Sequence, residues 1–323
     1  MAIIGGGPAG LTAAMYCRMR KMSVRVFDAG RAGGQLVSLY GDKPVHDWPG
    51  YANIIAAALA KQLVDHATHL DIEVLEHTKV VDLKPVDDGF ELVGRNVVTG
   101  AEARERATAV IVAIGGGAFE PRKLKVPGEE LLGEDQLTYR MPDATRAAGH
   151  DVVIVGGGDS GLEAAQSAHA AGARVTLVQV LDRFTGMETN IEKVDELGVA
   201  RRFNTRVKGL EIEDGRLRAV LAQTKGEPQP TRLPCDYLVV NIGAAVNLDA
   251  VKQWGIEVEG SQIKVDGEMR TSVAGIFACG DIVTYEGKYK LLLTASSEGC
   301  VAANTAYVHV RKPPRLTMGE LYT

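Results

Sequence analysis

Residues 2–10 read Ala-Ile-Ile-Gly-Gly-Gly-Pro-Ala-Gly, and residues 152–161 read Val-Val-Ile-Val-Gly-Gly-Gly-Asp-Ser-Gly. In each stretch an apolar strand runs into the spacing G-x-G-x-x-G. Apolar segments with helical patterning follow, over residues 11–19 and 162–171, and each leads to a second apolar strand. A lone glycine pattern is weak, but here strand, glycine loop, helix and strand occur in order and twice. The repeat predicts an α/β protein with two Rossmann-like nucleotide-binding units.

Each glycine loop is expected to hold the pyrophosphate of a dinucleotide. Glycine lets the phosphates touch the backbone, and the N-terminus of the following helix stabilises their charge. The residue after the second strand reads the adenosine ribose; it is Asp28 after residues 23–27 and Gln179 after residues 174–178. A carboxylate accepts hydrogen bonds from ribose hydroxyls, whereas Gln179 is neither an acid nor an arginine. We therefore expect the two copies to bind different ligands, or the second copy to bind weakly.

A third strand pattern lies near the C-terminus. Residues 273–279 are largely apolar, run into Gly280 and Asp281, and are followed by a helical pattern over residues 296–307. This arrangement is expected to place the aspartate near the ribityl chain of a flavin, at the start of a helix whose dipole acts on the ring.

Two more strands divide the chain into domains. Residues 109–113 and 237–241 are apolar, and each is followed closely by a glycine, Gly115 and Gly243. Glycine permits the backbone rotations of a hinge, so we expect the chain to cross between domains at these points. The predicted layout is a discontinuous FAD-binding domain, residues 1–114 and 245–323, with a second dinucleotide (NAD(P)H-like) domain, residues 118–241, inserted in it.

Composition excludes several classes of function. The net charge of −5 argues against a general affinity for nucleic acid or for an anionic membrane. No apolar run reaches the ~18 residues of a membrane span, and no signal peptide precedes the first strand, so we expect a cytoplasmic protein. The cysteines show no C-x-x-C and no metal-ligand spacing, so no metal site is predicted. They are interpreted as core residues, with a redox pair of the last two as the alternative: Cys17, Cys235, Cys279 and Cys300.

The chain resembles the low-molecular-weight thioredoxin reductases, and most of all the thioredoxin-reductase-like ferredoxin–NADP reductases. The resemblance covers nearly the whole length. Its most specific parts are the run Gly-Ala-Phe-x-Pro-Arg-Lys-Leu at residues 117–124 and the Tyr-Glu-Gly at residues 285–287 that follows Gly-Asp. The other matching pieces are residues 33–40, 47–50, 156–160 and 277–281.

The resemblance implies a homodimer that binds FAD non-covalently. It assigns FAD contacts to Gly5, Gly7, Pro8, Gly10, Asp28, Gly34, Gln35, Leu36, Tyr40, Asp47, Val80, Phe119 and Asp281. The second glycine loop assigns a second nucleotide site to Gly156, Gly158, Asp159, Ser160, Gly161 and Gln179. His46 aligns with a position near the isoalloxazine where relatives place an aromatic ring. It is therefore a candidate to stack on the flavin, with an ordinary loop histidine as the alternative.

Two departures from the family pattern bear on function. Thioredoxin reductases carry a redox-active C-x-x-C just before the second glycine loop, but residues 136–149 contain no cysteine, which excludes a dithiol relay by that route. The ferredoxin reductase branch also lacks this pair. NADPH-using relatives end the second strand in His-Arg-Arg-Asp-x-Phe-Arg, whereas residues 179–185 read Gln-Val-Leu-Asp-Arg-Phe-Thr. Each lost charge-assisted bond to a 2′-phosphate is worth roughly 1.5–3 kcal/mol, which argues against the NADP(H) binding that the resemblance implies.

The predicted function is that of a FAD-dependent oxidoreductase resembling ferredoxin–NADP reductase. It would pass electrons between a nicotinamide nucleotide and a one-electron carrier, because a flavin accepts a hydride and releases single electrons. An acidic ferredoxin would need a basic face, and its candidates are Arg122, Lys123, Lys125, Arg311, Lys312 and Arg315. One alternative is a pyridine-nucleotide-independent flavoenzyme that is ferredoxin-linked or carries a second flavin. An alternative of another class is a non-catalytic flavin-binding redox sensor or scaffold.

Overall fold

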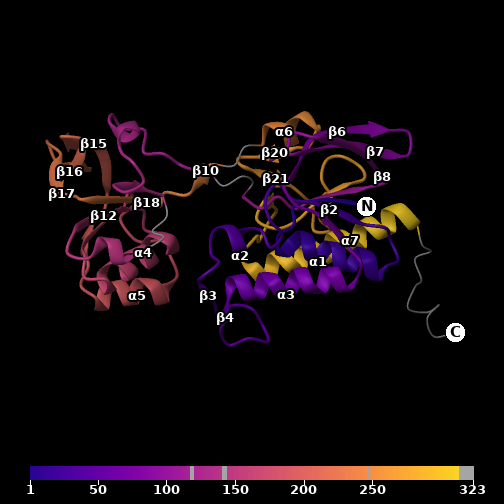
Figure 1. The fold of residues 1–323 in the computed structure, drawn as a ribbon, viewed down its shortest axis with the longest axis horizontal. Coiled ribbons are helices and arrows are strands. Elements are labelled where there is room, and N and C mark those ends of the chain that lie inside the picture. The colour runs from indigo at the N-terminus through magenta and orange to yellow at the C-terminus, as the bar shows by residue number, and fades with distance from the viewer. Residues whose placement is uncertain (117–119, 140–143, 246–247, 313–323) are drawn as a thin grey trace. The chain divides into compact units, whose positions relative to one another are not determined.

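The computed structural model describes residues 1–116, 120–139, 144–245 and 248–312. The chain packs into two compact units (Figure 1). The first unit combines residues 1–118 and 246–323, and the second is the continuous stretch 119–245. Each unit is built on a five-stranded parallel sheet, so the predicted α/β fold with two Rossmann-like units is confirmed.

The sheet of the first unit has the strand order β22-β9-β1-β2-β5, with every neighbouring pair parallel. Its central strands read as uninterrupted apolar runs because both faces of a parallel sheet are covered. The register pairs Ile3 with Val26 on one side and with Ile111 on the other, and all three are fully buried. The strands are β1 (Ala2–Ile4), β2 (Arg25–Phe27), β5 (Glu73–Leu75), β9 (Val110–Val112) and β22 (Ile276–Ala278).

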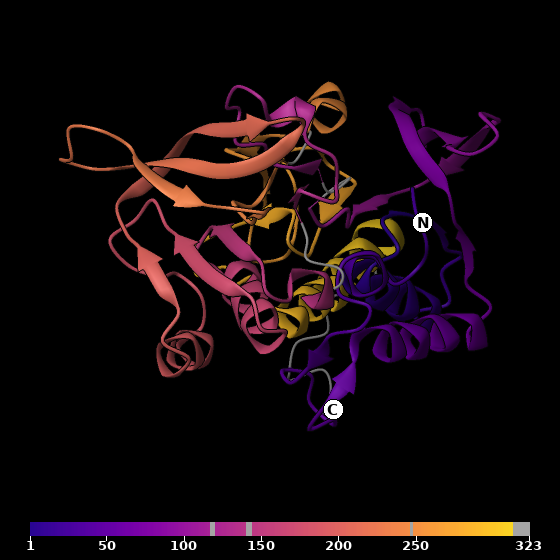
Figure 2. The same cartoon turned by 60° about the vertical axis from the view of Figure 1, so that its left-hand side comes forward.

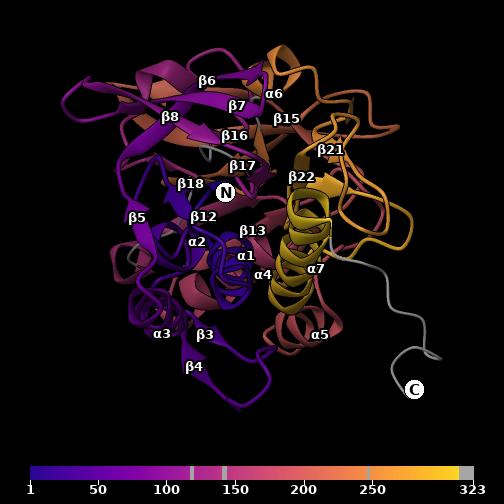
Figure 3. The ribbon, with the colours of Figure 1, turned by 90° about the vertical axis from the view of Figure 1, so that its right-hand side faces the viewer.

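Three helices of the first unit run side by side next to this sheet (Figures 1 and 3). They are α1 (Pro8–Met19), α3 (Ala56–His69) and α7 (Leu292–Arg311). Helix α1 contacts both others, and its approach to α7 is close because Gly299 has no side chain. A Cβ atom at Gly299 would lie 2.3 Å from the carbonyl oxygen of Ala9. The first turn of α1 and the middle of α7 are thereby held against each other.

The sheet of the second unit repeats this layout, with the strand order β11-β18-β12-β13-β14 and parallel pairing throughout. Helices α4 (Asp159–Ala170) and α5 (Glu188–Glu196) pack together beside it. The strands are β11 (Leu137–Thr138), β12 (Asp151–Val155), β13 (Arg174–Val178), β14 (Ala200–Arg202) and β18 (Tyr237–Val240).

Each unit also contains a three-stranded antiparallel sheet that the sequence patterns did not predict. In the first unit it consists of β6 (Thr78–Val86), β7 (Gly89–Asn96) and β8 (Glu102–Ala107). In the second it consists of β15 (Thr205–Glu213), β16 (Arg216–Thr224) and β17 (Thr231–Pro234), drawn in salmon to orange in Figure 2. These strands carry many charged residues on an exposed face, so they lack the apolar runs that marked the parallel strands.

The two chain connections between the units pair with each other. Strand β10 (Glu120–Pro121) is antiparallel to β19 (Ala244–Ala245). In the part of the chain that the structure describes, no helix is long and apolar enough to cross a membrane. The remaining short elements are α2 (Gln35–Ser38), β3 (Pro44–Val45), β4 (Ile54–Ile55), η1 (Glu129–Leu131), η2 (Ala144–Ala147), α6 (Asp249–Gln253), β20 (Val258–Glu259), β21 (Gln262–Lys264) and β23 (Val283–Thr284).

Candidate functional site

The first glycine loop joins β1 to α1. Two of its glycines are tightly packed, and a third leaves the backbone accessible. A Cβ atom at Gly5 would lie 2.2 Å from the carbonyl oxygen of Ala113, and one at Gly10 would lie 1.9 Å from that of Gly5. Both positions therefore require glycine for close packing of strand and helix. A Cβ atom at Gly7 would meet only the Cα of Gly34, at 3.8 Å. The loop thus leaves its backbone accessible at Gly7, where a pyrophosphate would approach the start of α1.

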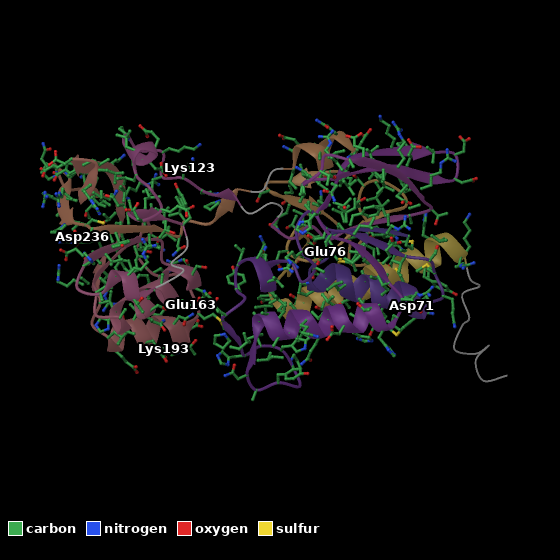
Figure 4. The ribbon with its side chains drawn as sticks, in the orientation of Figure 1. Asp71, Glu76, Lys123, Glu163, Lys193 and Asp236 are labelled. Carbon is green, nitrogen blue, oxygen red and sulfur yellow. The ribbon has the colours of Figure 1, made fainter. Side chains whose placement is uncertain are left out.

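Asp28 follows β2 and is tied to the same loop. Its carboxylate accepts hydrogen bonds from the backbone N–H of Gly6 at 2.6 Å and of Gly30 at 2.7 Å. Burial raises the pKa of Asp28, and the two N–H donors oppose that rise. Glu76, labelled in Figure 4, contributes to the raised pKa of Asp28 by its charge and accepts the N–H of Ala32 at 2.8 Å. No sequence pattern pointed to Glu76, which follows β5 as Asp28 follows β2.

Helix α2 brings further predicted residues to this loop. A Cβ atom at Gly34, the residue before α2, would lie 2.8 Å from the Cα of Gly7. The amide nitrogen Nε2 of Gln35 lies 3.1 Å from the place of a Cβ atom at Gly116, just after β9. Gly34 and Gln35 therefore connect the glycine loop with the end of β9. This is the carboxyl edge of the sheet, where ligands of such folds bind.

Asp281 lies at the same edge, directly after β22 and Gly280. Its side chain is half-buried, and its carboxylate has no hydrogen-bond partner among the described residues. Burial raises the pKa of Asp281, and the charges of Lys288 and Lys290 oppose the rise. A half-buried carboxylate without a donor is the group expected to bind ligand hydroxyls. With the open backbone at Gly7, it shows that the residues present fit a dinucleotide with a hydroxyl-bearing chain.

The remaining predicted FAD contacts lie in different surroundings. Leu36 and Val80 are buried in the core, and Tyr40 is partly buried, with its ring 5.3 Å from the ammonium of Lys43. His46 and Asp47 are exposed after β3. Pro8 opens α1, and Phe119 lies outside the described residues. The structure therefore gathers the glycines, Asp28, Gln35 and Asp281 at one edge and leaves His46 on the surface.

The second glycine loop, between β12 and α4, has the same construction. A Cβ atom at Gly156 would lie 2.1 Å from the carbonyl oxygen of Asn241, and one at Gly161 would lie 2.1 Å from that of Gly156. At Gly158 a Cβ atom would meet only the Thr185 hydroxyl, at 3.9 Å. This loop therefore also presents open backbone at the start of a helix, here at Gly158.

A segment after β13 is fixed to this second loop by backbone hydrogen bonds. The N–H groups of Thr185 and Gly186 donate to the carbonyl oxygen of Gly157 at 2.8 and 3.2 Å. Asp159 at the start of α4 accepts hydrogen bonds from the N–H of Met187 at 2.7 Å and from the Asn190 side chain at 2.8 Å. The Asp159 carboxylate therefore forms hydrogen bonds within the protein and holds residues 187–190 next to the start of α4. Ser160, beside it, is exposed, and its carbonyl oxygen accepts from Asn241 at 3.3 Å.

Gln179 follows β13 as Asp28 follows β2, but its side chain forms hydrogen bonds with the protein's own backbone. The residue is 6% exposed; its Oε1 accepts the N–H of Val180 at 2.9 Å and its Nε2 donates to the carbonyl oxygen of Arg183 at 3.3 Å. Val180 and Leu181, which stand where NADPH-using relatives carry arginines, are 43% and 45% exposed. These two exposed positions are therefore apolar, and Arg183 is the exposed cation of the same turn.

Comparison with known proteins agrees with this geometry. Residues 1–299 match the family of pyridine nucleotide-disulphide oxidoreductases. The chain belongs to this family. Ferredoxin–NADP reductase from Streptococcus sanguinis is 33% identical over 312 residues, covering 96% of this chain and 94% of that protein. Ferredoxin–NADP reductase 2 from Chloroherpeton thalassium is 36% identical over 311 residues, covering 95% and 89%.

The solved structures that resemble the chain include thioredoxin reductases. That of Lactococcus lactis has a TM-score of 0.84 and 25% identity, and covers 97% of this chain and 99% of its own. That of T. acidophilum has a TM-score of 0.83 and 25% identity, with coverages of 95% and 96%. The protein is therefore a flavin-dependent oxidoreductase that resembles ferredoxin–NADP reductases. This assignment replaces the alternative of a non-catalytic flavin-binding scaffold.

The cysteines of this oxidoreductase are free thiols. Cys279, directly before the Gly280 turn, is fully buried, and burial raises its pKa. Burial likewise raises the pKa of Cys17 and Cys235 to about 12. A raised pKa disfavours the thiolate, which is the reactive form of cysteine. Among the described residues no cluster of histidine, cysteine and acidic side chains could hold a metal ion.

Proposed function

We propose that this oxidoreductase passes electrons between a nicotinamide nucleotide and a one-electron carrier of the ferredoxin type. The first unit would bind FAD and the second a dinucleotide. The observation that carries the proposal is the repeated cradle, in which Gly7 and Gly158 present open backbone at the starts of α1 and α4. The names of the relatives, ferredoxin–NADP reductases at 33–36% identity, support the same pairing of substrates.

The residues of the first unit divide the binding of FAD among them. The open backbone at Gly7 would receive the pyrophosphate, and Asp28 the adenosine ribose. Asp281 would accept hydrogen bonds from the ribityl hydroxyls, and Gln35 would contact the ring system near Gly116. Bound FAD supplies two-electron exchange with a nicotinamide and one-electron exchange with a carrier.

The second unit would bind the pyrophosphate of its dinucleotide without reading a 2′-phosphate. The exposed side chains at the reading positions, Val180 and Leu181, carry no charge, and Gln179 is engaged with the backbone. The relatives' names favour NADP(H), whereas the lack of charge at Val180 and Leu181 removes the usual basis for selecting NADP(H) over NAD(H). We infer that the preference for NADPH over NADH is weak. These residues also favour a second candidate, a pyridine-nucleotide-independent flavoenzyme with a second flavin in this site.

Two protein partners are proposed, an acidic ferredoxin and a second copy of this chain. An acidic ferredoxin would dock on basic residues, of which Lys123 (labelled in Figure 4) and Lys125 are exposed, while Arg315 lies outside the described residues. A homodimer is proposed from the resemblance to thioredoxin reductases. Four free thiols suit a reducing compartment such as the cytoplasm.

The test is an anaerobic absorbance titration of the purified protein with NADPH and then NADH, together with a count of flavin per chain. We expect one flavin per chain and bleaching of its absorbance by both nucleotides. Absence of bleaching, with about two flavins per chain, would contradict the nicotinamide proposal and establish the second candidate.

A further inference from the structure

A buried ion pair between Lys288 and Glu298 lies next to the turn at Gly280, which directly precedes Asp281. The ammonium of Lys288 is 2.5 Å from Oε1 of Glu298 on α7, and the two side chains are 6% and 5% exposed. Taking two charges out of water is unfavourable, and a buried pair contributes little net stability compared with an apolar pair. A buried pair can instead hold a segment of backbone in one conformation, and Glu298 contacts the segment between Gly280 and Lys288.

Glu298 binds both ends of the segment from Gly280 to Lys288. Its Oε2 accepts the backbone N–H of Gly280 at 2.8 Å, and its Oε1 accepts the hydroxyl of Tyr285 at 2.8 Å as well as the Lys288 ammonium. One carboxylate thus closes the segment into a loop. Because Gly280 directly precedes Asp281, its N–H bond anchors the point from which the Asp281 side chain extends.

The opposite side of the turn rests on α1. A Cβ atom at Gly280 would lie 3.0 Å from the Cβ of Ala9, in the first turn of α1, and the φ of Gly280 is +85°. The turn is therefore held between the start of α1 and a side chain of α7. The first turn of α1 follows the Gly7 cradle, so the same contact relates Asp281 to the proposed pyrophosphate site.

We propose that Glu298 is a positioning residue for FAD. It fixes the Gly280 turn so that the Asp281 carboxylate, which has no hydrogen-bond partner in the described part of the chain, meets the ribityl chain of a flavin whose pyrophosphate lies at Gly7. Lys288 neutralises Glu298, so the anchor adds no net negative charge beside Asp281. The Tyr285 hydroxyl donates the second hydrogen bond to Oε1 of Glu298. The inference rests on the proposed placement of FAD at Gly7 and Asp281.

The substitution Glu298→Gln tests the anchor because it keeps the shape and changes the hydrogen bonds. A glutamine has one acceptor oxygen, so it cannot accept from Gly280 on one side and from Lys288 on the other. Adding Lys288→Met removes one donor. The glutamine can then accept from Gly280 while its NH₂ donates to the Tyr285 hydroxyl. The double variant therefore restores a matched set of donors and acceptors.

The measurements are the FAD dissociation constant of the apoprotein, the flavin midpoint potential, and the thermal midpoints of the apo and FAD-bound forms. We expect E298Q to weaken FAD binding by about tenfold or more and to shift the potential, and K288M/E298Q to recover most of the affinity. The matched control is Glu257→Gln, at the exposed Lys264–Glu257 pair in the same unit (3.1 Å), which should leave both flavin readouts unchanged.

Two results would overturn the proposal. The first is an E298Q protein with wild-type FAD affinity and potential and an equal loss of thermal midpoint in both forms, because that is a purely structural role. The second is a double variant that binds FAD no better than E298Q. If E298Q does not fold, Tyr285→Phe, which leaves the ion pair intact, must still weaken FAD binding measurably. Failure of the wild-type apoprotein to bind FAD would instead contradict the flavoprotein assignment itself.

Discussion

The carbonyl oxygen of Gly5 lies 1.9 Å from the point where a Cβ atom at residue 10 would stand. In the second unit the carbonyl oxygen of Gly156 lies 2.1 Å from the corresponding point at residue 161. Both helices therefore begin against the end of their own preceding strand, at a distance that only glycine allows. The two glycine loops share this contact, although the residues after the second strands, Asp28 and Gln179, differ.

Alanine at these positions should affect the two units separately. Gly10→Ala must displace the start of α1, at a cost of about 1–3 kcal/mol, and should abolish retention of FAD. Gly161→Ala should leave FAD bound and slow reduction by nicotinamide. The readouts are flavin per chain and the rate of anaerobic bleaching. Gly267→Ala, whose Cβ would meet no atom within 4 Å, is the control. Full flavin content in the Gly10 variant would contradict the prediction.

Arginines at the exposed apolar positions should create selectivity for NADPH. In Val180→Arg/Leu181→Arg, each effective bond to a 2′-phosphate adds roughly 1.5–3 kcal/mol, so the ratio of kcat/KM for NADPH over NADH should rise about tenfold or more. The control places the same two changes at Val97 and Val98, which are 50% and 75% exposed in the first unit. An equal rise in the control would show a general charge effect and refute a specific site.

Asp281→Asn should stabilise the apoprotein while weakening FAD binding. The pKa of Asp281 is raised in the folded state, so its ionised form opposes folding at neutral pH. Below the ordinary aspartate pKa of about 3.9, both states are protonated and the difference between variant and wild type should vanish. Thermal unfolding of the apoproteins between about pH 3 and pH 8, which spans the ordinary aspartate pKa, checks this. Asp87→Asn, at an exposed position, serves as control, and a gain that persists unchanged at low pH would exclude the explanation.

The double variant Cys279→Ala/Cys300→Ala should retain electron transfer. Cys279 is fully buried, and burial raises its pKa, so it lacks the accessible thiolate of a redox cysteine. A reductive titration of the wild type should consume about two electrons per flavin, with no further uptake by a dithiol. Uptake of about four electrons, lost in the double variant, would restore the redox pair as an interpretation.

Features whose physical signal is local can be recognised from the sequence. A strand, a glycine loop and a helix are consecutive, and Asp28 follows its strand at a fixed spacing, so these elements can be recognised from residue order. The ends were less predictable. Helix α7 begins at Leu292, earlier than the predicted residue 296, and β22 is shorter than expected because Gly275 turns the chain with a φ of +83°.

The contacts that depend on tertiary packing were missed. No sequence pattern singled out Lys288 and Glu298, whose burial and pairing appear only in the folded structure. The strands of the antiparallel sheets carry charges at many positions, as in β8, so no apolar run marked them although each pairs with the next strand along the chain. The internal use of Gln179 by the backbone was likewise invisible in the sequence, because it depends on the turn at residues 180–183.

The position of β22 has a consequence for biosynthesis. Its partner strand β9 is complete at residue 112, but β22 itself comes at residues 276–278, after the entire second unit. All strands of the second sheet are therefore synthesised before the last strand of the first sheet. Because domains fold as units while the chain emerges, the inserted unit should reach its native state first. The FAD site proposed at Gly7 and Asp281 would then be completed only in the last phase of translation, and the nascent protein would remain colourless until that point.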